Sequence, residues 1–327
     1  MKTLILTSDD IRRIIDMDMV IEAVEEAFEE YGKGRTIMPA KIYLPLEQYQ
    51  GDFRAMPAFV GGSAGLKWVN VHPRNRIKTG LPTVMAVIIY SDPETGFPLA
   101  IMDGTIITNY RTGAAGAVAS KYLARKESRS LGLVGCGAQA QTQLEAISKF
   151  FDLGIVRIFS PSQDCMNAFV AKNKEFYPEK TSLEEAVNSD IVCTTTPVKN
   201  SIVNREWIKE GTHINAIGAD AKGKEELDPA ILLIAKVVVD DIAQASHSGE
   251  IHVPIAKGIY RKENVYAALG EIVAGTKPGR EGDEITVFDS TGLAIQDVAT
   301  AEVIVEEAKR LGVGSEIDLV CQQWANL

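Results

Sequence analysis

A glycine-rich turn in the middle of the chain has the residue types and spacing needed to hold a pyrophosphate. Gly135 and Gly137 follow a short apolar run at 131–134, after which the apolar spacing becomes that of a helix. The first glycine permits the tight turn, the second lets the backbone approach the phosphates, and Ala140 replaces the third glycine, where helix and strand pack. The phosphates would then bind at the helix N-terminus. Because further strand–helix units follow, the pattern favours a dinucleotide site over an ordinary strand–turn–helix corner.

Cations on short strands in the first third of the chain are candidates for binding a carboxylate. Arg54 and Lys67 lie in apolar surroundings, and Lys41 precedes another apolar run. A charge in such surroundings is costly unless an anion pairs with it, and a substrate carboxylate would serve. Taken singly, each is better explained as a solvent-facing residue of an alternating strand. Arg111, which directly precedes a helical segment, could bind a pyrophosphate or a carboxylate, or form a salt bridge between domains.

Two polar residues follow predicted strands in the second half of the chain. Asp220 comes after the strand at 213–217, and ligands of open parallel sheets bind at the carboxyl ends of strands. That position suits a proton carrier, with Lys224 one turn away, but it equally suits a helix cap or loop acid. Ser290 follows the last strand and would contact a nicotinamide or simply cap the next helix.

The acidic residue expected about 20 positions after the glycines, which would bind the ribose of NAD, is missing. The second strand of the unit ends at Phe159 and is followed by Ser160 and Ser162, which could donate hydrogen bonds to a 2′-phosphate. No arginine follows directly. The sequence therefore leaves the choice between NAD and NADP open.

The elements that would position these residues indicate an α/β protein with two domains. Short alternating runs between 37 and 103, separated by glycine and proline, predict an antiparallel sheet. Six later apolar runs alternate with helical segments and predict a Rossmann doubly wound parallel sheet. They lie at 131–134, 156–159, 191–194, 213–217, 236–240 and 285–288. We expect an α+β substrate-binding and dimerisation domain at 1–115, with a return helix at 295–327, and a dinucleotide-binding domain at 116–294.

Composition narrows the class of protein. The 327 residues are 46% hydrophobic and 24% charged, as in a soluble globular protein, and carry a formal net charge of −10. An acidic chain of this kind disfavours nucleic acid or an anionic membrane as a partner, and no apolar run approaches the roughly 20 residues of a membrane span. The four cysteines lack C-x-x-C spacing, so we expect a reducing, cytoplasmic setting without disulfides. His247 and His252 have no clear third ligand, so no metal is expected.

Taken together, these motifs resemble the ornithine cyclodeaminase and mu-crystallin family, most closely its archaeal-type alanine dehydrogenase branch. The resemblance covers nearly the whole chain. It rests on DFRAMP at 52–57, GLKWVN at 65–70, LPT at 81–83, RTGAA at 111–115, GCGAQ at 135–139, HINAIGAD at 213–220 and FDSTGLAIQD at 288–297.

The resemblance implies roles for individual residues and a homodimer. Residues matching Arg54 and Lys67 hold the carboxylate of an amino acid, and the lysine is also the proposed proton carrier of the branch. Asp220 matches the acid that acts on the substrate amine in cyclodeaminases, while Ser160 stands where NAD-using members have an acid. The predicted cofactor-binding set is Thr83, Arg111, Thr112, Gly135, Gly137, Ala138, Gln139, Ser160, Ser162, Ile217, Gly218, Ala219, Lys224 and Ser290, and the predicted substrate-binding set is Lys41, Arg54, Lys67 and Arg111.

The implied activity is that of an NAD- or NADP-dependent oxidoreductase of small 2-amino acids. Alanine, interconverted with pyruvate and ammonia, is the leading substrate, and Lys67 and Asp220 are the expected catalytic residues. The alternatives are an ornithine cyclodeaminase, an imino-acid reductase, and a mu-crystallin-like protein that binds NADP and a ligand without essential turnover.

Overall fold

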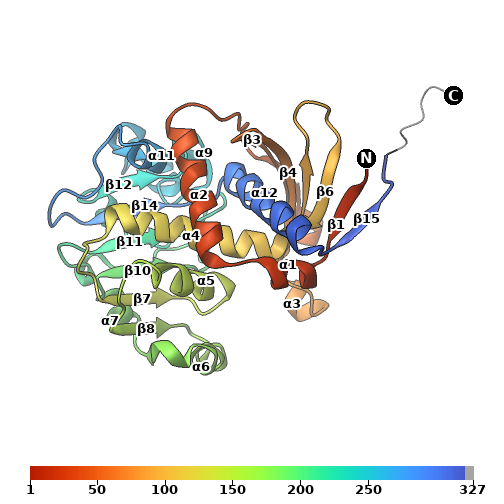
Figure 1. Ribbon diagram of the computed structural model, residues 1–327. Coiled ribbons are helices and arrows are strands. Elements are labelled where there is room, and N and C mark those ends of the chain that lie inside the picture. Colours follow the sequence, from red (N-terminus) through yellow and green to blue (C-terminus); the bar gives the residue numbers. More distant parts are fainter. Residues whose placement is uncertain (321–327) are drawn as a thin grey trace, which may run out of the picture. The chain divides into compact units, whose positions relative to one another are not determined.

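The computed structural model describes residues 1–320, which form two compact units (Figure 1). The first unit contains residues 1–23, 35–108 and 294–320, and the second contains residues 24–34 and 109–293. Helices α2 (Met17–Gly32) and α4 (Gly104–Leu123) continue from one unit into the other. The expected boundary at 115/116 falls inside α4, because a continuous helix there leaves no linker. No helix in residues 1–320 has the length and apolar character needed to cross a membrane.

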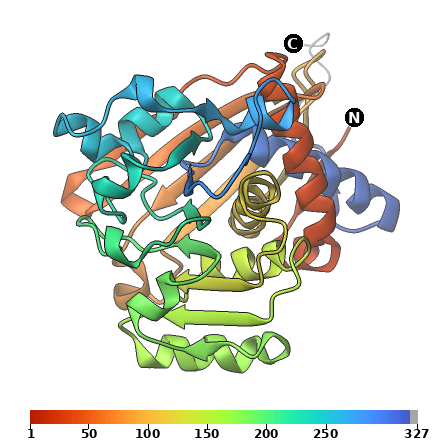
Figure 2. The same cartoon turned by 90° about the vertical axis from the view of Figure 1, so that its left-hand side faces the viewer.

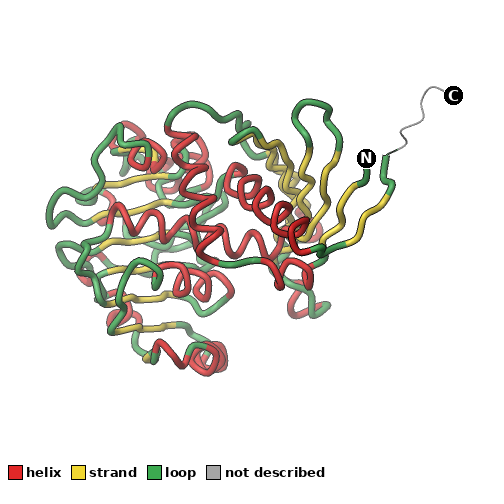
Figure 3. The backbone as a smooth tube through the Cα atoms, viewed as in Figure 1, coloured by secondary structure: helices red, strands yellow, loops and turns green. Residues whose placement is uncertain are grey.

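The first unit is built on a seven-stranded mixed sheet of order β15-β1-β6-β5-β4-β3-β2 (Figure 3). All neighbours are antiparallel except β1 and β6, so the expected antiparallel sheet gains a parallel pair where the N-terminal strand joins it. The strands are β1 (Thr3–Leu6), β2 (Ile42–Leu46), β3 (Gly51–Val60), β4 (Ser63–Val71), β5 (Val84–Ser91), β6 (Pro98–Asp103) and β15 (Ser315–Ile317). Two short helices, α1 (Ser8–Ile14) and α3 (Asn75–Lys78), flank them.

The sheet has one covered and one partly exposed face, as its period-two pattern requires. Helix α12 (Ala294–Leu311) packs across β3, β4 and β5 (Figure 1). The approach is close, since a Cβ added to Gly65 would lie 3.0 Å from Val298 Cγ2. The return helix expected at 295–327 ends at Leu311, and β15 follows it; residues 321–327, including Cys321, lie outside the described part.

The second unit contains an eight-stranded, fully parallel sheet of order β13-β12-β14-β11-β10-β7-β8-β9. The six predicted strands are all present. They are β7 (Ser130–Val134), β8 (Ile155–Phe159), β10 (Ile191–Thr194), β11 (His213–Ala216), β12 (Lys236–Val239) and β14 (Thr286–Asp289). Two edge strands of two residues each, β9 (Glu179–Lys180) and β13 (Ala267–Ala268), are too short to give a sequence pattern.

Helices connect these strands and cover the sheet, whose central strands β7, β10, β11 and β14 are buried on both faces. They are α5 (Ala138–Ile147), α6 (Gln163–Lys172), α7 (Leu183–Val187), α8 (Pro229–Leu232), α9 (Ile242–Ser248), α10 (His252–Ala256) and α11 (Leu269–Val273). Figure 2 shows β7 and β8 side by side in yellow-green, with α6 beyond the edge of the sheet. Strand β8, which follows β7 in the chain, lies on one side of β7, and β10 lies on its other side. The order of the strands therefore reverses direction at β7, and ligands of such sheets bind at the carboxyl end of the strands at this point.

Candidate functional site

The glycine turn lies at the carboxyl end of β7, between the strand and α5. Gly135 has φ +110, and an added Cβ would lie 2.4 Å from Thr195 Oγ1, so the fold itself requires glycine there. Gly137 is the residue that precedes α5, and a Cβ there would meet nothing within 4 Å. The fold therefore does not require glycine at 137, which fits a position kept small for a ligand. Ala140 is fully buried between helix and strand, as predicted.

These two glycines give a matched pair of variants. We expect Gly137→Val to fold with a melting temperature near that of the parent, because the site has room, but to bind NADH at least 10-fold more weakly because a side chain occupies the phosphate position. Gly135→Val should instead unfold at a markedly lower temperature, since its backbone and Thr195 exclude a side chain. Fluorescence titration and thermal melts measure both. Unchanged NADH affinity in Gly137→Val would place the dinucleotide elsewhere.

Polar residues from α4 and from the loop after β14 belong to the same unit as the glycine turn. Arg111 is buried, and its guanidinium packs so closely on Gly292 that a Cβ there would lie 2.5 Å from Nη1. Gln139, in the first turn of α5, donates from Nε2 to Asn109 Oδ1 at 3.2 Å. The Thr112 carbonyl accepts from Gln143 at 2.9 Å, which ties α4 to α5. A guanidinium and a helix N-terminus both suit an anionic pyrophosphate.

The loops after β11 and β14 lie at neighbouring carboxyl ends of the same sheet. Ile217, Gly218 and Ala219 follow β11, and a Cβ on Gly218 would lie 2.2 Å from the Thr196 carbonyl oxygen, so glycine is required there. Ser290 is buried, and its backbone N–H donates to Ala216 O at 3.0 Å.

Asp220 is half-buried in the loop after β11 and pairs with Lys224 at 2.5 Å, so its carboxylate is held by a cation. Ala138, the first residue of α5, has a backbone N–H at the end of the helix where such groups have no intrahelical partner. The two histidines considered as metal ligands each hydrogen-bond a backbone carbonyl through Nδ1.

The expectation that the chain has no disulfide is wrong, because Cys136 in the glycine turn is bonded to Cys165 at the start of α6. Strands β7 and β8 are adjacent and parallel, with Val134 opposite Phe159, so the segments after them meet at one edge of the sheet. A pair 29 residues apart has no C-x-x-C signature, and only the fold brings it together. Ser162 caps α6 by accepting from Cys165 N–H at 3.3 Å, and Ser162 N–H donates to Ser160 Oγ at 3.3 Å.

Removing this crosslink should destabilise the protein. For a closed loop of this length, Cys165→Ser is expected to lower the free energy of unfolding by about 3.6 kcal/mol, because the unfolded chain regains conformational freedom. Urea unfolding with and without a thiol reductant measures the effect. Parent and variant should differ without reductant and coincide with it. Equal stability under both conditions would show that the crosslink does not form in solution.

The first unit places two buried cations on the covered face of its sheet. In the register of β3 and β4, Arg54 lies opposite Val69 and Met56 opposite Lys67, so both cations project from the same face as diagonal neighbours. Arg54 donates from Nε to Asp52 Oδ1 at 2.7 Å and lies over the Tyr43 ring. The Lys67 side chain is 1% exposed, and its Nζ lies 2.7 Å from Asp297 Oδ2. The solvent-facing interpretation of these cations is therefore wrong.

Two other predicted residues of this unit lie at strand ends. Lys41 immediately precedes β2, two positions before Tyr43, and an extended backbone places it on the same face as Arg54. Thr83 immediately precedes β5, and its carbonyl accepts from His72 N–H at 2.8 Å. The roles of Lys41 and Thr83 in binding stay predictions.

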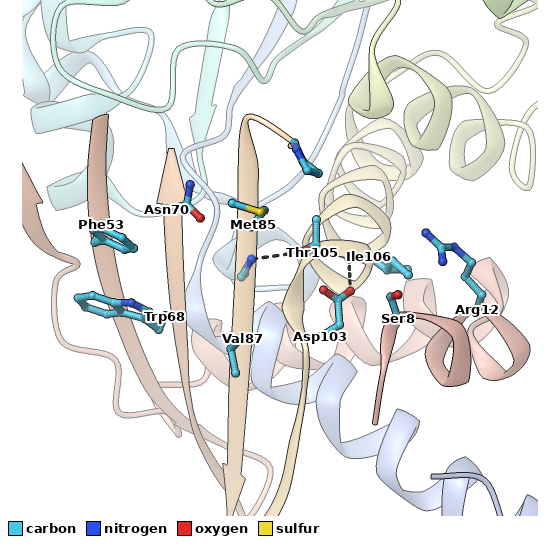
Figure 4. A pocket seen from close by; sticks show the side chains of 12 residues that line it. Ser8, Arg12, Phe53, Trp68, Asn70, Met85, Val87, Asp103, Thr105 and Ile106 are labelled. Atoms are coloured by element: carbon cyan, nitrogen blue, oxygen red, sulfur yellow. Dashed lines mark hydrogen bonds between the residues drawn. The ribbon is translucent and has the colours of Figure 1, made fainter. Parts of the chain in front are cut away.

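The opposite face of the same sheet carries a groove of about 370 Å³ (Figure 4). Phe53 and Trp68 stack there with ring centroids 5.2 Å apart, and Met85, Val87 and Asp103 continue the lining. Because side chains alternate along a strand, this groove faces away from Lys67. The groove is therefore separate from the candidate substrate residues.

Buried acids form a set that sequence reasoning missed. Glu226 accepts from Gly218 N–H at 2.8 Å and from Thr194 Oγ1 at 2.7 Å, and Glu250 accepts from the Glu226 and Leu227 N–H groups. Burial raises the pKa of Glu226 and, with the charge of Glu226 beside it, that of Glu250. Burial also raises the pKa of Asp289, at the end of β14, to about 7.

The sequence signal for these acids was weak. Among Glu226, Glu250 and Asp289, only Asp289 has a sequence signal, because it is an acid at the end of an apolar strand. Asp297 was also missed, although an acid in the apolar first turn of α12 is a visible anomaly.

Known proteins match almost the whole chain. The ornithine cyclodeaminase/mu-crystallin family matches residues 1–311. The alanine dehydrogenase of Archaeoglobus fulgidus is 53% identical over 320 residues, covering 97% of this chain and 98% of that protein.

Solved structures give the same relationship. An archaeal alanine dehydrogenase dimer with bound NAD matches with a TM-score of 0.95 and 53% identity, covering 98% of this chain and 100% of that one. Thermococcus litoralis Delta(1)-pyrroline-2-carboxylate reductase in complex with NADH and L-proline matches with a TM-score of 0.93 and 38% identity, covering 96% and 100%. The chain therefore belongs to the ornithine cyclodeaminase/mu-crystallin family.

Proposed function

We propose that this protein is a nicotinamide-dependent oxidoreductase of small 2-amino acids that interconverts alanine with pyruvate and ammonia. The observation that carries the proposal is the pair of buried cations, Arg54 and Lys67, on one face of β3 and β4. Arg54 pairs with Asp52 and Lys67 pairs with Asp297, yet a guanidinium has five N–H donors and an ammonium has three, so the two side chains can together also bind an amino-acid carboxylate. The alanine dehydrogenase of A. fulgidus, at 53% identity, supports alanine as the substrate.

In this proposal the first unit binds the substrate and handles protons. Arg54 and Lys67, with Lys41 and Arg111 as further candidates, hold the carboxylate and so fix the direction of the Cα–H bond. After hydride loss, a water oxygen bonds to Cα of the iminium as the C=N electron pair moves to nitrogen, and neutral Lys67 takes the proton that the water loses. Lys67 then returns this proton to the nitrogen. The C–N bond breaks, its electron pair stays on nitrogen, and ammonia is released. The proton of the remaining hydroxyl group moves to the ammonia, which leaves pyruvate and ammonium. Asp220 is the second proton carrier, and it takes the proton that the substrate ammonium loses before hydride loss gives the iminium.

The second unit is proposed to hold NAD or NADP. The open position at Gly137, the α5 N-terminus and buried Arg111 fit the pyrophosphate, and the related structures contain NAD or NADH. The other residues of the predicted cofactor-binding set, which include Thr83 and Ser290, are proposed on the basis of the family resemblance. When bound, the cofactor supplies the hydride acceptor. Since Ser160 brings no charge that repels a 2′-phosphate, we expect NADP to be tolerated beside NAD.

Initial rates with purified protein test the proposal. Alanine with NAD, and pyruvate with ammonia and NADH, should give a large change in absorbance of the reduced cofactor. The T. litoralis relationship favours Delta(1)-pyrroline-2-carboxylate as a second substrate, so it belongs in the same screen. Proline release from ornithine with no net change in cofactor would identify a cyclodeaminase instead. Cofactor binding without turnover of any of these compounds would favour a binding protein.

We also propose that a second copy of the chain covers the outer face of the first unit's sheet. Ile42, Trp68 and Val87 on this face are 65%, 41% and 45% exposed, which is unusual for large apolar side chains gathered beside a groove. The related archaeal alanine dehydrogenase is a dimer.

Trp68→Asp should convert a dimer into a monomer, because it introduces a charge into an apolar contact. Light scattering after size exclusion measures the mass, and Val320→Asp, an exposed apolar residue away from the groove, is the matched control. A parent that elutes as a monomer would overturn the proposal.

We place the protein in the cytoplasm, where nicotinamide dinucleotides and amino acids are available. The disulfide between Cys136 and Cys165 is unusual for a cytosolic protein, apart from those of hyperthermophiles. Cell fractionation, with alkylation of free thiols before lysis, reports the location and the thiol state together.

A further inference from the structure

The ion pair between Lys67 and Asp297 joins the central strand of the substrate face to the helix that covers it. Asp297 lies in the first turn of α12, and its carboxylate is 2.7 Å from Lys67 Nζ. Both side chains are 1% exposed. Desolvation of two charges offsets most of their attraction, so a buried pair is weak evidence of a stabilising role. The pair therefore calls for an explanation other than stability.

The geometry determines where the ammonium is held. Lysine has four rotatable side-chain bonds, and a carboxylate oxygen 2.7 Å from Nζ restricts where the ammonium can lie. Asp297 is itself fixed by the backbone of a helix packed on β3, β4 and β5. A flexible cation thus becomes a group with a defined position, as proton transfer to a bound substrate requires.

We propose that Asp297 is a positioning residue that holds Lys67 Nζ in place for proton transfer and favours its protonated form. The inference rests on the proposed function of Lys67 as the proton carrier. A negative charge at this distance makes the neutral amine a better proton acceptor, so Lys67 removes the proton of the attacking water more readily. In this inference Asp297 acts through Lys67.

Other charged or titratable groups share this face of the sheet and must be considered in any pH profile. They include Lys41, Tyr43, Asp52 and Arg54 from the β2–β3 side, Tyr90 from β5, and Glu302 and Glu306 of α12, whose charges act on Tyr90. Asp52 pairs with Arg54, and Tyr90 hydrogen-bonds Ser63 at 2.8 Å. Asp297 lies 2.7 Å from Lys67 Nζ, so we expect the largest electrostatic effect of replacing Asp297 at Lys67.

The test compares Asp297→Asn and Asp297→Glu with Thr300→Val. Thr300 is a buried residue of the same helix, and its hydroxyl donates to the Gln296 carbonyl. Rates per folded molecule are measured against pH with the best substrate of the parent, and NADH titration counts the folded molecules. Asp297→Asn should lose at least 10-fold in kcat with little change in KM, and the rise of its rate with pH should move to lower pH by about one unit or more. Asp297→Glu should restore the position of that rise, and Thr300→Val should match the parent.

The outcomes separate this inference from the proposed function. If Asp297→Asn melts at a lower temperature but keeps the parental kcat and pH profile per folded molecule, the pair is structural and the inference is wrong. If Asp297→Asn fails to fold, Asp297→Glu decides. A parental pH profile with a kcat below that of the parent supports the inference, because the charge is kept while the carboxylate is displaced. A full parental kcat contradicts the inference that Asp297 must hold Lys67 Nζ in one position. A parent with no turnover of any amino or imino acid overturns the proposed function itself.

Discussion

Replacing Lys67 with alanine is expected to lower turnover by about 10²-fold or more per folded molecule, the usual contribution of a positioned acid or base. The variant also leaves Asp297 buried without its cation, so it should be less stable than the parent. Steady-state rates therefore need to be divided by the folded fraction, which NADH titration and melting curves provide.

Lys67→Arg is the more informative companion. A guanidinium keeps the charge, can pair with Asp297 and can bind a carboxylate, but it does not give up its proton at neutral pH. We expect near-parental stability, a modest change in KM and a rate close to that of Lys67→Ala. Lys78→Ala, which removes an exposed lysine of the same unit, should leave the rate unchanged. Near-parental turnover in Lys67→Arg would reduce the role of Lys67 to carboxylate binding.

Asp289→Asn is expected to change how stability depends on pH. Burial raises the pKa of Asp289 from 3.8 to about 7, so the folded state binds this proton more tightly than the unfolded state. The stability contributed by the proton is fully present below the unfolded value and is lost as pH rises through about 7. Over that whole window the loss corresponds to about 4 kcal/mol. The variant lacks the group and should not lose this stability.

Urea unfolding of parent and variant at several pH values measures the difference. Between about pH 5 and pH 8 the variant should gain about 3 kcal/mol relative to the parent. Asp164→Asn, an exposed carboxylate in the same unit, should give parallel curves. Parallel curves for Asp289→Asn would mean that Asp289 is ionised in the folded protein at neutral pH.

Most of the fold follows from local patterns in the sequence. The six predicted strands of the second unit are short segments of four or five residues rich in apolar side chains, and helical segments alternate with them. The capping box at Ser182 that starts α7 is such a pattern, because both of its hydrogen bonds are local. Local sequence patterns do not predict contacts between segments that are far apart in the chain. Examples are the pairing of β1 with β6, the two-residue edge strands and the assignment of residues 24–34 to the second unit.

Some features of the candidate site also follow from local sequence, and others depend on contacts between distant segments. The requirement for glycine at 135 is encoded locally, in a turn with positive φ, and so it was predictable. The burial of Lys67 was only one of two interpretations, because an alternating strand does not reveal which face α12 covers. The disulfide between Cys136 and Cys165 and the pair between Lys67 and Asp297 join residues that are far apart in sequence. Only the arrangement of strands and helices brings their atoms together.

Alanine deuterated at Cα tests the central claim most directly. The account predicts that the deuterium leaves Cα with its electron pair, so pyruvate should form together with reduced cofactor one mass unit heavier, in equal amounts, as read by mass spectrometry. Lys67→Arg should make both products more slowly and still in equal amounts. Pyruvate formed without deuterium in the cofactor, or no pyruvate at all from a protein that binds NADH, would contradict hydride transfer from alanine.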